Sequence, residues 1–194
     1  DYFVGSSHIT PKIEESHYVE KIWRLPEISQ CFTPPDYEVK IESLPAIKNG
    51  YITFGSVNKL SKICDETVTL WSRILASVPN SKLLLKYKDF DNQKIIENTL
   101  SRFIKHNVNK GQLVLKGESA TRKELLEVYN KIDIALDPFP FQGNTTTCEA
   151  VWMGVPVITL KGNRYIFHFG ESINSNLNMH EWVAEDSKEY VSKA

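Results

Sequence analysis

From residue 51 onward, short apolar runs alternate with longer amphipathic stretches, and this alternation constrains the fold more than any other feature of the chain. Strand-like runs occupy residues 51–57, 82–88, 112–117, 132–137 and 155–160. Helical spacing of apolar residues occupies 65–78, 92–107, 121–132, about 144–154 and the closing stretch 185–194. Strands that alternate with helices form parallel βαβ units. The pattern therefore predicts an α/β fold built on a doubly wound, mostly parallel sheet.

The first 50 residues do not follow this alternation. We expect a strand within residues 1–9 and a helix over residues 14–25. A stretch with three prolines and no clear period follows, and it is typical of a connector. The sequence thus predicts a division into residues 1–50, which cross into the main unit, and residues 51–194, which form it.

Charge and cysteine content exclude several classes of protein. The chain has 194 residues with 23 Lys+Arg and 24 Asp+Glu, a formal net charge of −1, so nothing favours nucleic acid or an anionic membrane as a partner. The three cysteines are far apart and lack metal-ligand spacing, which argues against a disulfide framework or structural zinc. A reducing, cytoplasmic location is expected. No apolar run is long enough to predict a membrane span.

The segment DPFPFQGNTTTCEAVWMGVPVIT places small and polar residues between two apolar runs. Asp137 ends a predicted strand, and Gly143 belongs to the turn that follows. Thr145, Thr146 and Thr147 then open a predicted helix. In open α/β sheets, ligands bind at the carboxyl ends of strands, and a helix N-terminus offers unpaired N–H groups and partial positive charge. This threonine loop is therefore a candidate site for a phosphate or diphosphate.

A plain helix cap is the alternative interpretation of the same loop. Asn144 or Thr145 could accept a hydrogen bond from the first turn, with no ligand involved. Glu149 lies one helical turn beyond Thr145, where it could accept hydrogen bonds from ribose hydroxyls or could only complement the helix dipole. Both interpretations of Glu149 stay open at this point.

Two further loops are expected at the same edge of the sheet. The segment FGSVNKLSKICDE carries Lys59 and Lys62 between a strand and a helix, where cations could meet the anion of the threonine loop. Two surface lysines are more often only solvated charge. The segment KGESATRKELL brings Ala120, Thr121 and Arg122 to the next helix start, where capping by the threonine is the simpler explanation. Together the three loops would converge on one crevice.

Motifs for other chemistries are absent from the sequence. The five histidines show no HxxxH or HExxH spacing, so no metal site is assigned. No GxGxxG follows a strand, and neither a GxxxxGK[ST] P-loop nor a GxSxG elbow occurs. The sequence therefore indicates no nicotinamide site, no P-loop ATPase and no protein-held cofactor.

The segments YITFGSVNKLSK and LWSRILASVPNSKLLLK, and above all IALDPFPFQGNTTTCEAVWMGVPVITLKG, resemble the C-terminal catalytic lobe of the O-linked N-acetylglucosamine transferase family, of the bacterial repeat-protein type. They are also similar to the plant protein O-fucosyltransferases. The resemblance covers residues 51–194 strongly, and residues 1–50 are similar to the end of the N-terminal catalytic lobe and the crossover. It implies a GT-B architecture of two Rossmann-like lobes.

The resemblance also implies an activity: metal-independent, inverting transfer of a sugar from a nucleotide-diphosphate-sugar to a protein Ser or Thr. Lys62 matches the lysine that stabilises the leaving diphosphate and is the implied catalytic residue. Glu149 matches the acid that holds the ribose. The other implied donor contacts are Lys59, Ala120, Arg122, Asn144, Thr145, Thr146 and Thr147.

Several positions depart from the family pattern. Asn144 stands where the animal enzymes have His, Lys59 where they have Gln, and Leu125 where they have a His near the base. These changes leave a UDP-sugar and a GDP-sugar both open as donor. His168 falls where an arginine is expected. The chain lacks most of the N-terminal lobe and the helical (TPR) repeats of the family, so we expect this chain alone to bind donor without transferring sugar.

Two other classes of function stay open from the sequence. One is a different GT-B reaction, such as a small-molecule glycosyltransferase or a sugar-nucleotide epimerase. The other is a degenerate lobe that acts as an interaction scaffold without catalysis. The acceptor distinguishes the first from protein glycosylation, and loss of nucleotide binding identifies the second.

Overall fold

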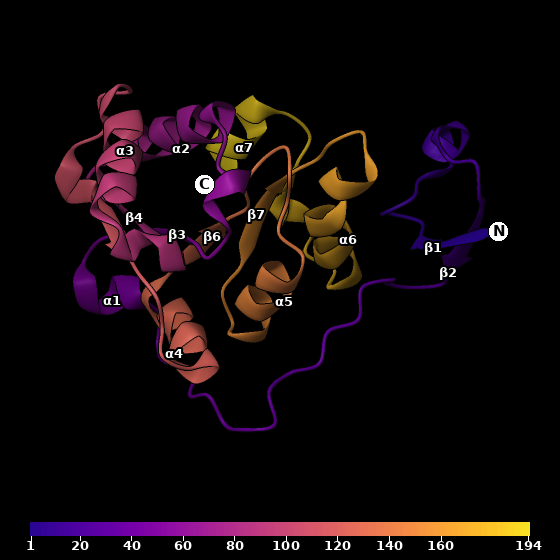
Figure 1. The fold of residues 1–194 in the computed structure, drawn as a ribbon, viewed down its shortest axis with the longest axis horizontal. Coiled ribbons are helices and arrows are strands. Elements are labelled where there is room, and N and C mark those ends of the chain that lie inside the picture. Colours follow the sequence, from indigo (N-terminus) through magenta and orange to yellow (C-terminus); the bar gives the residue numbers. More distant parts are fainter.

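The computed structural model describes residues 1–194 and contains two parallel sheets (Figure 1). The larger has the strand order β5-β4-β3-β6-β7-β8. Its strands are β3 (Thr53–Ser56), β4 (Lys82–Lys86), β5 (Leu113–Lys116), β6 (Ile134–Leu136), β7 (Val157–Leu160) and β8 (Val183–Ala184). Every neighbouring pair is parallel. The five predicted strands are confirmed, and the two-residue strand β8 adds a sixth that the sequence pattern did not predict.

The helices alternate with these strands as predicted. The α-helices are α1 (Pro45–Asn49), α2 (Asp65–Ser77), α3 (Gln93–Ile104), α4 (Arg122–Glu127), α5 (Thr145–Trp152), α6 (Phe169–Asn176) and α7 (Ser187–Lys193). Short 3-10 turns are η1 (Lys12–His17), η2 (Leu60–Lys62), η3 (Lys88–Asp91), η4 (Lys110–Gln112), η5 (Val128–Lys131), η6 (Tyr165–Phe167) and η7 (His180–Trp182). Helix α6 is the one α-helix after residue 50, apart from the short turns, that the sequence analysis missed.

Helices cover both faces of the larger sheet, which makes it doubly wound (Figure 1). On one face, a cluster of 17 buried residues includes Trp71 of α2, Phe103 of α3 and Tyr190 of α7. On the other face, a cluster of 11 buried residues includes Leu126 of α4 and Met153, just after α5. Apolar strands such as β4 contribute to both clusters, which explains their continuous apolar sequence.

The strand order reverses between β3 and β6. Numbered from β3, the order is 3-2-1-4-5-6, the arrangement of the Rossmann fold. The loops that follow β3 and β6 leave the sheet on either side of this switch point. Open α/β sheets bind ligands in the crevice that such diverging loops create. The topology therefore places the threonine loop and the Lys59–Lys62 loop on opposite sides of one crevice.

Residues 1–25 form a separate parallel pair, β1 (Tyr2–Ser6) and β2 (Lys21–Leu25), which lies at one end of the molecule (Figure 1). The predicted strand in residues 1–9 is confirmed. The predicted helix over residues 14–25 is wrong, because this stretch splits into the turn η1 and the strand β2. Its β-branched and aromatic residues, Ile22 and Trp23 among them, favour a strand once β1 is available to pair with it.

Residues 26–44 contain no helix or strand and run along the lower side of the molecule in Figure 1. Asn130 fixes the end of this connector by accepting from the N–H of Glu42 at 3.0 Å and donating to the carbonyl of Lys40 at 2.8 Å. The buried carboxylate of Asp133 accepts from the N–H groups of Ala46 and Thr53, at 2.7 and 2.8 Å. Side chains between α4 and β6 thus fix where the connector enters β3.

None of the helices has the length and apolarity to cross a membrane.

Candidate functional site

A cavity of about 780 Å³ lies at the switch point of the sheet. The loop after β3, the end of β4, the loop before α4 and the start of α5 form its walls. Eight of the nine predicted site residues line it: Lys59, Lys62, Ala120, Arg122, Asn144, Thr145, Thr146 and Glu149. The structure thus brings together residues that are up to 90 positions apart in the sequence, from Lys59 to Glu149.

The start of α5 presents unpaired N–H groups at the cavity wall. Asn144 precedes the helix, and its side chain makes no capping hydrogen bond. The N–H groups of Asn144, Thr145 and Thr146 find no acceptor within the chain, whereas those of Thr147 and Cys148 donate to the Asn144 carbonyl. The plain cap that the sequence also allowed is therefore not formed. Three donors and the positive end of the helix dipole remain for an anion.

Buried hydrogen bonds hold the threonine loop in this conformation. The Asp137 carboxylate accepts from the N–H of Gly143 at 2.6 Å and from the hydroxyl of Thr159 at 2.9 Å. Burial raises the pKa of Asp137 to about 7, although both hydrogen bonds and the nearby charge of Lys62 lower it. A Cβ on Gly143 would lie 2.6 Å from the hydroxyl of Thr146. The missing side chain at Gly143 therefore allows the loop to pack closely against its own threonines.

A second buried side chain of this loop, Gln142, ties it to the neighbouring elements. Its side-chain amide N–H donates to the carbonyl of Leu160 at 2.5 Å, and its oxygen accepts from the N–H of Gly170 at 2.7 Å. Gln142 is fully buried. The loop is thus fixed from below by β7 and from the side by α6, which leaves its outer surface rigid toward the cavity.

Lys62 lies across the cavity from the start of α5, on the turn η2. Its Nζ donates to the carbonyl of Gln142 at 2.7 Å and lies 4.1 Å from the centre of the Phe141 ring. Burial lowers the pKa of Lys62, and Asp137 raises it in part. Lys59 precedes the same turn and is exposed. The turn therefore places one partly buried cation against the threonine loop and adds one exposed cation to the cavity wall.

Glu149 forms the floor of the cavity, one turn into α5. It is 5% exposed and forms an ion pair with Arg122 of α4, with 3.1 Å between Oε1 and the guanidinium nitrogen. Burial raises the pKa of Glu149, and the charge of Arg122 opposes this. The pairing leaves the carboxylate available as an acceptor at the cavity wall, next to the phosphate-type donors.

The loop before α4 supplies the wall next to Arg122. Thr121 caps this helix by accepting from the N–H of Glu124 at 3.2 Å, as the simpler interpretation of this segment expected. The Glu124 side chain in turn accepts from the N–H of Ala120 at 2.9 Å. Leu125 also lines the cavity. The loop is therefore fixed by its own helix start, and Ala120 with Leu125 of α4 supplies the apolar part of this wall.

Thr147 and His168 do not reach the cavity. Thr147 is 2% exposed and lies beneath the start of α5, so the structure does not bring this predicted site residue to the wall. His168, which replaces an expected arginine, is buried between two carboxylates. Its Nε2 lies 3.0 Å from Glu14 and its Nδ1 lies 2.9 Å from Glu171. It joins the N-terminal segment to α6.

Several residues of the site were not identified from the sequence. Asn58 accepts from the hydroxyl of Thr146 at 3.0 Å and so connects the two loops of the crevice. Tyr129 is buried beneath α5, and its hydroxyl donates to the Thr146 carbonyl at 3.0 Å. Lys86 lines the cavity at the end of β4. The signal for Asn58 and Lys86 was their position after an apolar run, at the same sheet edge as the predicted loops.

The Rossmann-type strand order and the donor-rich crevice define the lobe of a GT-B glycosyltransferase fold. The sequence model of glycosyl transferase family 41 matches residues 38–194, and the chain belongs to this family. This confirms the resemblance seen in the sequence and the predicted fold class.

Curated relatives agree with this assignment. A Petunia hybrida protein is 34% identical over the whole chain and is named "Probable UDP-N-acetylglucosamine--peptide N-acetylglucosaminyltransferase SPINDLY". The protein of the same name from Hordeum vulgare is 37% identical over the whole chain. The chain spans 21% of the length of each of these relatives.

The fold matches a solved structure of the Thermobaculum terrenum O-GlcNAc transferase, determined as a mutant, with a TM-score of 0.91 and 32% identity. That match covers 100% of this chain and 36% of the other. A sucrose-phosphate synthase from Thermosynechococcus elongatus matches with a TM-score of 0.54 at 13% identity, over 100% of this chain and 53% of the other, which shows the shared fold alone.

Proposed function

We propose that this chain is the donor-binding lobe of a metal-independent, inverting glycosyltransferase of the O-GlcNAc transferase type, which modifies Ser and Thr hydroxyls of proteins. One observation carries the proposal. Three N–H groups without acceptors, at residues 144–146, lie at the wall of a crevice that Lys62 faces from the other side. Unpaired donors at a helix start and a cation that contacts the same loop suit a diphosphate.

The proposed chemistry is stabilisation of the leaving group. The acceptor oxygen attacks C1 of the donor sugar from the face opposite the diphosphate, so the configuration at C1 inverts. As the bond from C1 to the diphosphate oxygen breaks, its electrons pass to the diphosphate. The free N–H groups of residues 144–146, the hydroxyl of Thr145 and the ammonium of Lys62 stabilise that charge, which is the role a metal ion has in other enzymes.

The nucleoside would lie beside the diphosphate in the same cavity. Glu149 would accept a hydrogen bond from a ribose hydroxyl, and Arg122 would hold Glu149 in place at 3.1 Å. Ala120 and Leu125 offer an apolar surface for the base. The names of the relatives support a UDP-sugar as donor. A GDP-sugar is the alternative to test, because Asn144 and Lys59 depart from the family pattern.

We propose that donor and acceptor functions are divided along the protein. Residues 51–194 would bind the donor, and residues 1–50 would form the end of the other catalytic lobe and the crossover. The chain spans 36% of the length of the solved transferase, which supports the view that further segments supply the acceptor site, the group that takes the acceptor proton and helical repeats. On this view the 194 residues alone bind donor but do not transfer sugar.

The test is transfer by the intact protein. It is incubated with UDP-N-acetylglucosamine or GDP-fucose and a Ser/Thr peptide library, and the peptides are weighed by mass spectrometry with and without EDTA. The proposal predicts a sugar mass on Ser or Thr that EDTA does not remove. NMR of the product then reports the anomeric configuration, which should be opposite to that of the donor.

Other outcomes identify the alternatives. A free sugar product or a glycosylated small molecule, with no peptide modified, would indicate another GT-B reaction. Failure to bind any nucleoside diphosphate, in a protein that is well folded, would indicate an interaction scaffold. If EDTA abolishes transfer and Mg²⁺ restores it, only the metal independence is contradicted, and the rest of the proposal stands.

A further inference from the structure

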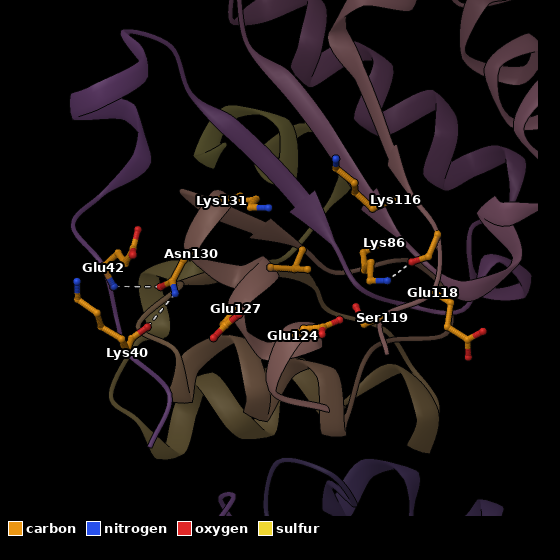
Figure 2. A pocket seen from close by; sticks show the side chains of 12 residues that line it. Lys40, Glu42, Lys86, Lys116, Glu118, Ser119, Glu124, Glu127, Asn130 and Lys131 are labelled. Atoms are coloured by element: carbon orange, nitrogen blue, oxygen red, sulfur yellow. Dashed lines mark hydrogen bonds between the residues drawn. The ribbon is translucent and has the colours of Figure 1, made fainter. Parts of the chain in front are cut away.

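Lys86 ends strand β4 at the junction of two cavities. It is 4% exposed, yet it lines both the 780 Å³ donor cavity and a second cavity of about 620 Å³ next to it. Figure 2 shows its side chain on the wall of the second cavity, with the nitrogen directed to the loop before α4. Glu118 and Ser119 of that loop also line both cavities. Lys86 therefore lies at the boundary between the two cavities.

The ammonium of Lys86 has few partners for a buried charge. Its Nζ donates to the carbonyl of Gly117, and it takes part in none of the ion pairs of the chain. An ammonium has three donors, so two remain unused. Burial lowers the pKa of Lys86, although Asp91, Glu118 and Glu124 oppose this. The two unused donors of Lys86, at the wall of both cavities, are therefore free to meet an acceptor on a ligand.

The position of Lys86 suits the base of a bound nucleotide. The diphosphate donors lie at the end of β6, and β4 is two strands away across β3. Neighbouring strands are about 4.8 Å apart, so the two ends are separated by about 10 Å. Glu149 and Arg122 lie at the wall between them. A nucleoside diphosphate whose phosphates bind at α5 and whose ribose meets Glu149 would therefore direct its base toward β4.

We propose that Lys86 reads the base of the donor by donating a hydrogen bond to its keto oxygen, an inference that rests on the proposed function of this cavity. Uracil and guanine carry an acceptor oxygen on the base edge at which cytosine and adenine carry an amino donor. A lysine ammonium has no acceptor. Lys86 thus selects keto bases over amino bases and is a specificity-determining residue.

The contact between Lys86 and the Gly117 carbonyl holds the ammonium at the loop before α4. It joins the end of β4 to the loop after β5, and Asp91 fixes the same loop by accepting from the N–H of Glu118 at 3.0 Å. With one N–H held by the Gly117 carbonyl, two N–H groups of Lys86 remain for a base. A base that presents an amino group there would leave the ammonium unpaired and bring two donors together.

The experiment is calorimetric titration of the intact protein and of Lys86→Met with UDP, GDP, CDP and ADP. In the wild type, we expect UDP or GDP, whichever binds better, to bind at least about tenfold more tightly than CDP or ADP. This difference, the keto preference, is the effect of one hydrogen bond to a charged group. In Lys86→Met, that preference should fall below about threefold. Inorganic pyrophosphate, which has no base, should bind the wild type and the variant equally.

Lys116→Met is the matched control. Lys116 is the Cα partner of Lys86 in the register of β4 and β5. It is exposed, and it lines the second cavity but not the donor cavity. Its removal should leave the keto preference unchanged. If Lys86→Met does not fold, Lys86→Gln keeps a donor for Gly117 and adds an acceptor. An amide can pair with either base edge, so the preference should again fall below about threefold.

Each outcome decides the inference. An unchanged keto preference in Lys86→Met or Lys86→Gln would overturn it. An equal loss of affinity for all four nucleotides and for pyrophosphate would also overturn it, because Lys86 would then act on the phosphate end. If the wild type binds pyrophosphate and nucleotides without preference, the donor site stands and the role of Lys86 fails. If the wild type binds none of them, the proposed function itself fails.

Discussion

The Nζ of Lys62 lies 2.7 Å from the carbonyl oxygen of Gln142. This bond places a partly buried ammonium against the loop whose following residues have the free N–H groups. The side chain of Gln142 is itself bonded to Leu160 and Gly170, so the lysine is held by a rigid part of the structure. Lys62 is thus oriented toward the diphosphate position before a donor binds, which limits the reorganisation needed during reaction.

Lys62→Ala should lower the rate of sugar transfer at saturating donor by at least about tenfold, and by up to about 10²- to 10³-fold if it acts as a preorganised donor to the leaving group. The fold should be kept, because Lys62 ends a short 3-10 turn and forms no ion pair. The measurement is kcat of the intact protein. Lys94→Ala, which removes an exposed lysine of α3, is the control and should leave kcat unchanged. Wild-type turnover by Lys62→Ala would remove this residue from the mechanism.

Glu149 should contribute to nucleotide binding through a hydroxyl of the ribose. If its carboxylate accepts from a ribose O–H, removing that hydroxyl from the nucleotide should weaken binding by about tenfold or more in the wild type. In Glu149→Ala the same removal should cost less than about threefold, because the acceptor is gone. The measurement is calorimetry with the 2′-deoxy and 3′-deoxy forms of the preferred nucleoside diphosphate. Equal losses in both proteins would show that Glu149 does not contact the ribose.

Asp137 should make stability depend on pH. Burial raises its pKa from 3.8 to about 7, so between about pH 4 and pH 7 the folded state binds more protons than the unfolded state. The stability that this group contributes is complete below its unfolded pKa and is lost as the pH rises through 7, by up to about 1.4 kcal/mol per pH unit.

Asp137→Asn tests this directly. The amide can still accept from Gly143 and can donate to Thr159, so the threonine loop should keep its shape. Urea unfolding at several pH values should show the variant gaining stability relative to the wild type as the pH rises from 4 to 7. A difference that does not change with pH would contradict the raised pKa of Asp137.

His168 should also make the stability of the fold depend on pH. Burial lowers its pKa, but hydrogen bonds with Glu171 and Glu14 outweigh burial and raise the pKa above 6.5 overall. Lys161 pairs with Glu171 at 3.5 Å from the other side. The stability from His168 is therefore complete below pH 6.5 and is lost as the pH rises through the raised value.

His168→Gln should remove that loss. Urea unfolding of the wild type should show a decline above pH 6.5 that the variant lacks, whereas the exposed His106→Gln should decline as the wild type does. Burial raises the pKa of Glu171, but its contacts with His168 and Lys161 together outweigh burial and lower the pKa, so its contribution is lost only as the pH falls below 4.5. An identical decline in His168→Gln and in the wild type would contradict the coupling.

The α/β core could be predicted because its apolar periods are long and regular. The helix around Trp71 and the apolar run of β4 indicate their structures without reference to the rest of the chain. Strand β8 could not be predicted, because two residues, Val183 and Ala184, contain no period, and their pairing with β7 decides their conformation. The error over residues 14–25 has the same origin, since the pairing of β2 with β1 outweighs local helical spacing.

The candidate site was predictable in its anion-binding part and less so in its supports. Loops at strand ends, such as the threonine loop, converge through the topology of a parallel sheet, so Lys62 and Thr145 could be placed together from the sequence. The supports depend on tertiary contacts over long separations. Gln142 bonds to Gly170, and Asn58 bonds to Thr146, 88 positions away, with no local pattern to indicate either contact.

The central claim is that the start of α5 binds the diphosphate of the donor, and thermal unfolding with ligand tests it most directly. Three proteins are heated with UDP, GDP or no ligand: the intact wild type, the double variant Thr145→Val/Thr146→Val and the control Thr69→Val. The control removes a hydroxyl of α2 that donates to the backbone carbonyl of Asp65. At about 100 times the dissociation constant, a ligand stabilises the folded state by about 2.7 kcal/mol.

We predict that UDP or GDP raises the melting temperature of the wild type and of Thr69→Val by a few degrees. The double variant should show little or no shift, because it loses the Thr145 hydroxyl, a donor to the phosphate worth about 1.5–3 kcal/mol, and also the Thr146 hydroxyl that ties the loop to Asn58. An equal shift in all three proteins would contradict the account by placing the ligand elsewhere. A wild-type protein that shows no shift with either nucleotide would contradict the donor site as a whole.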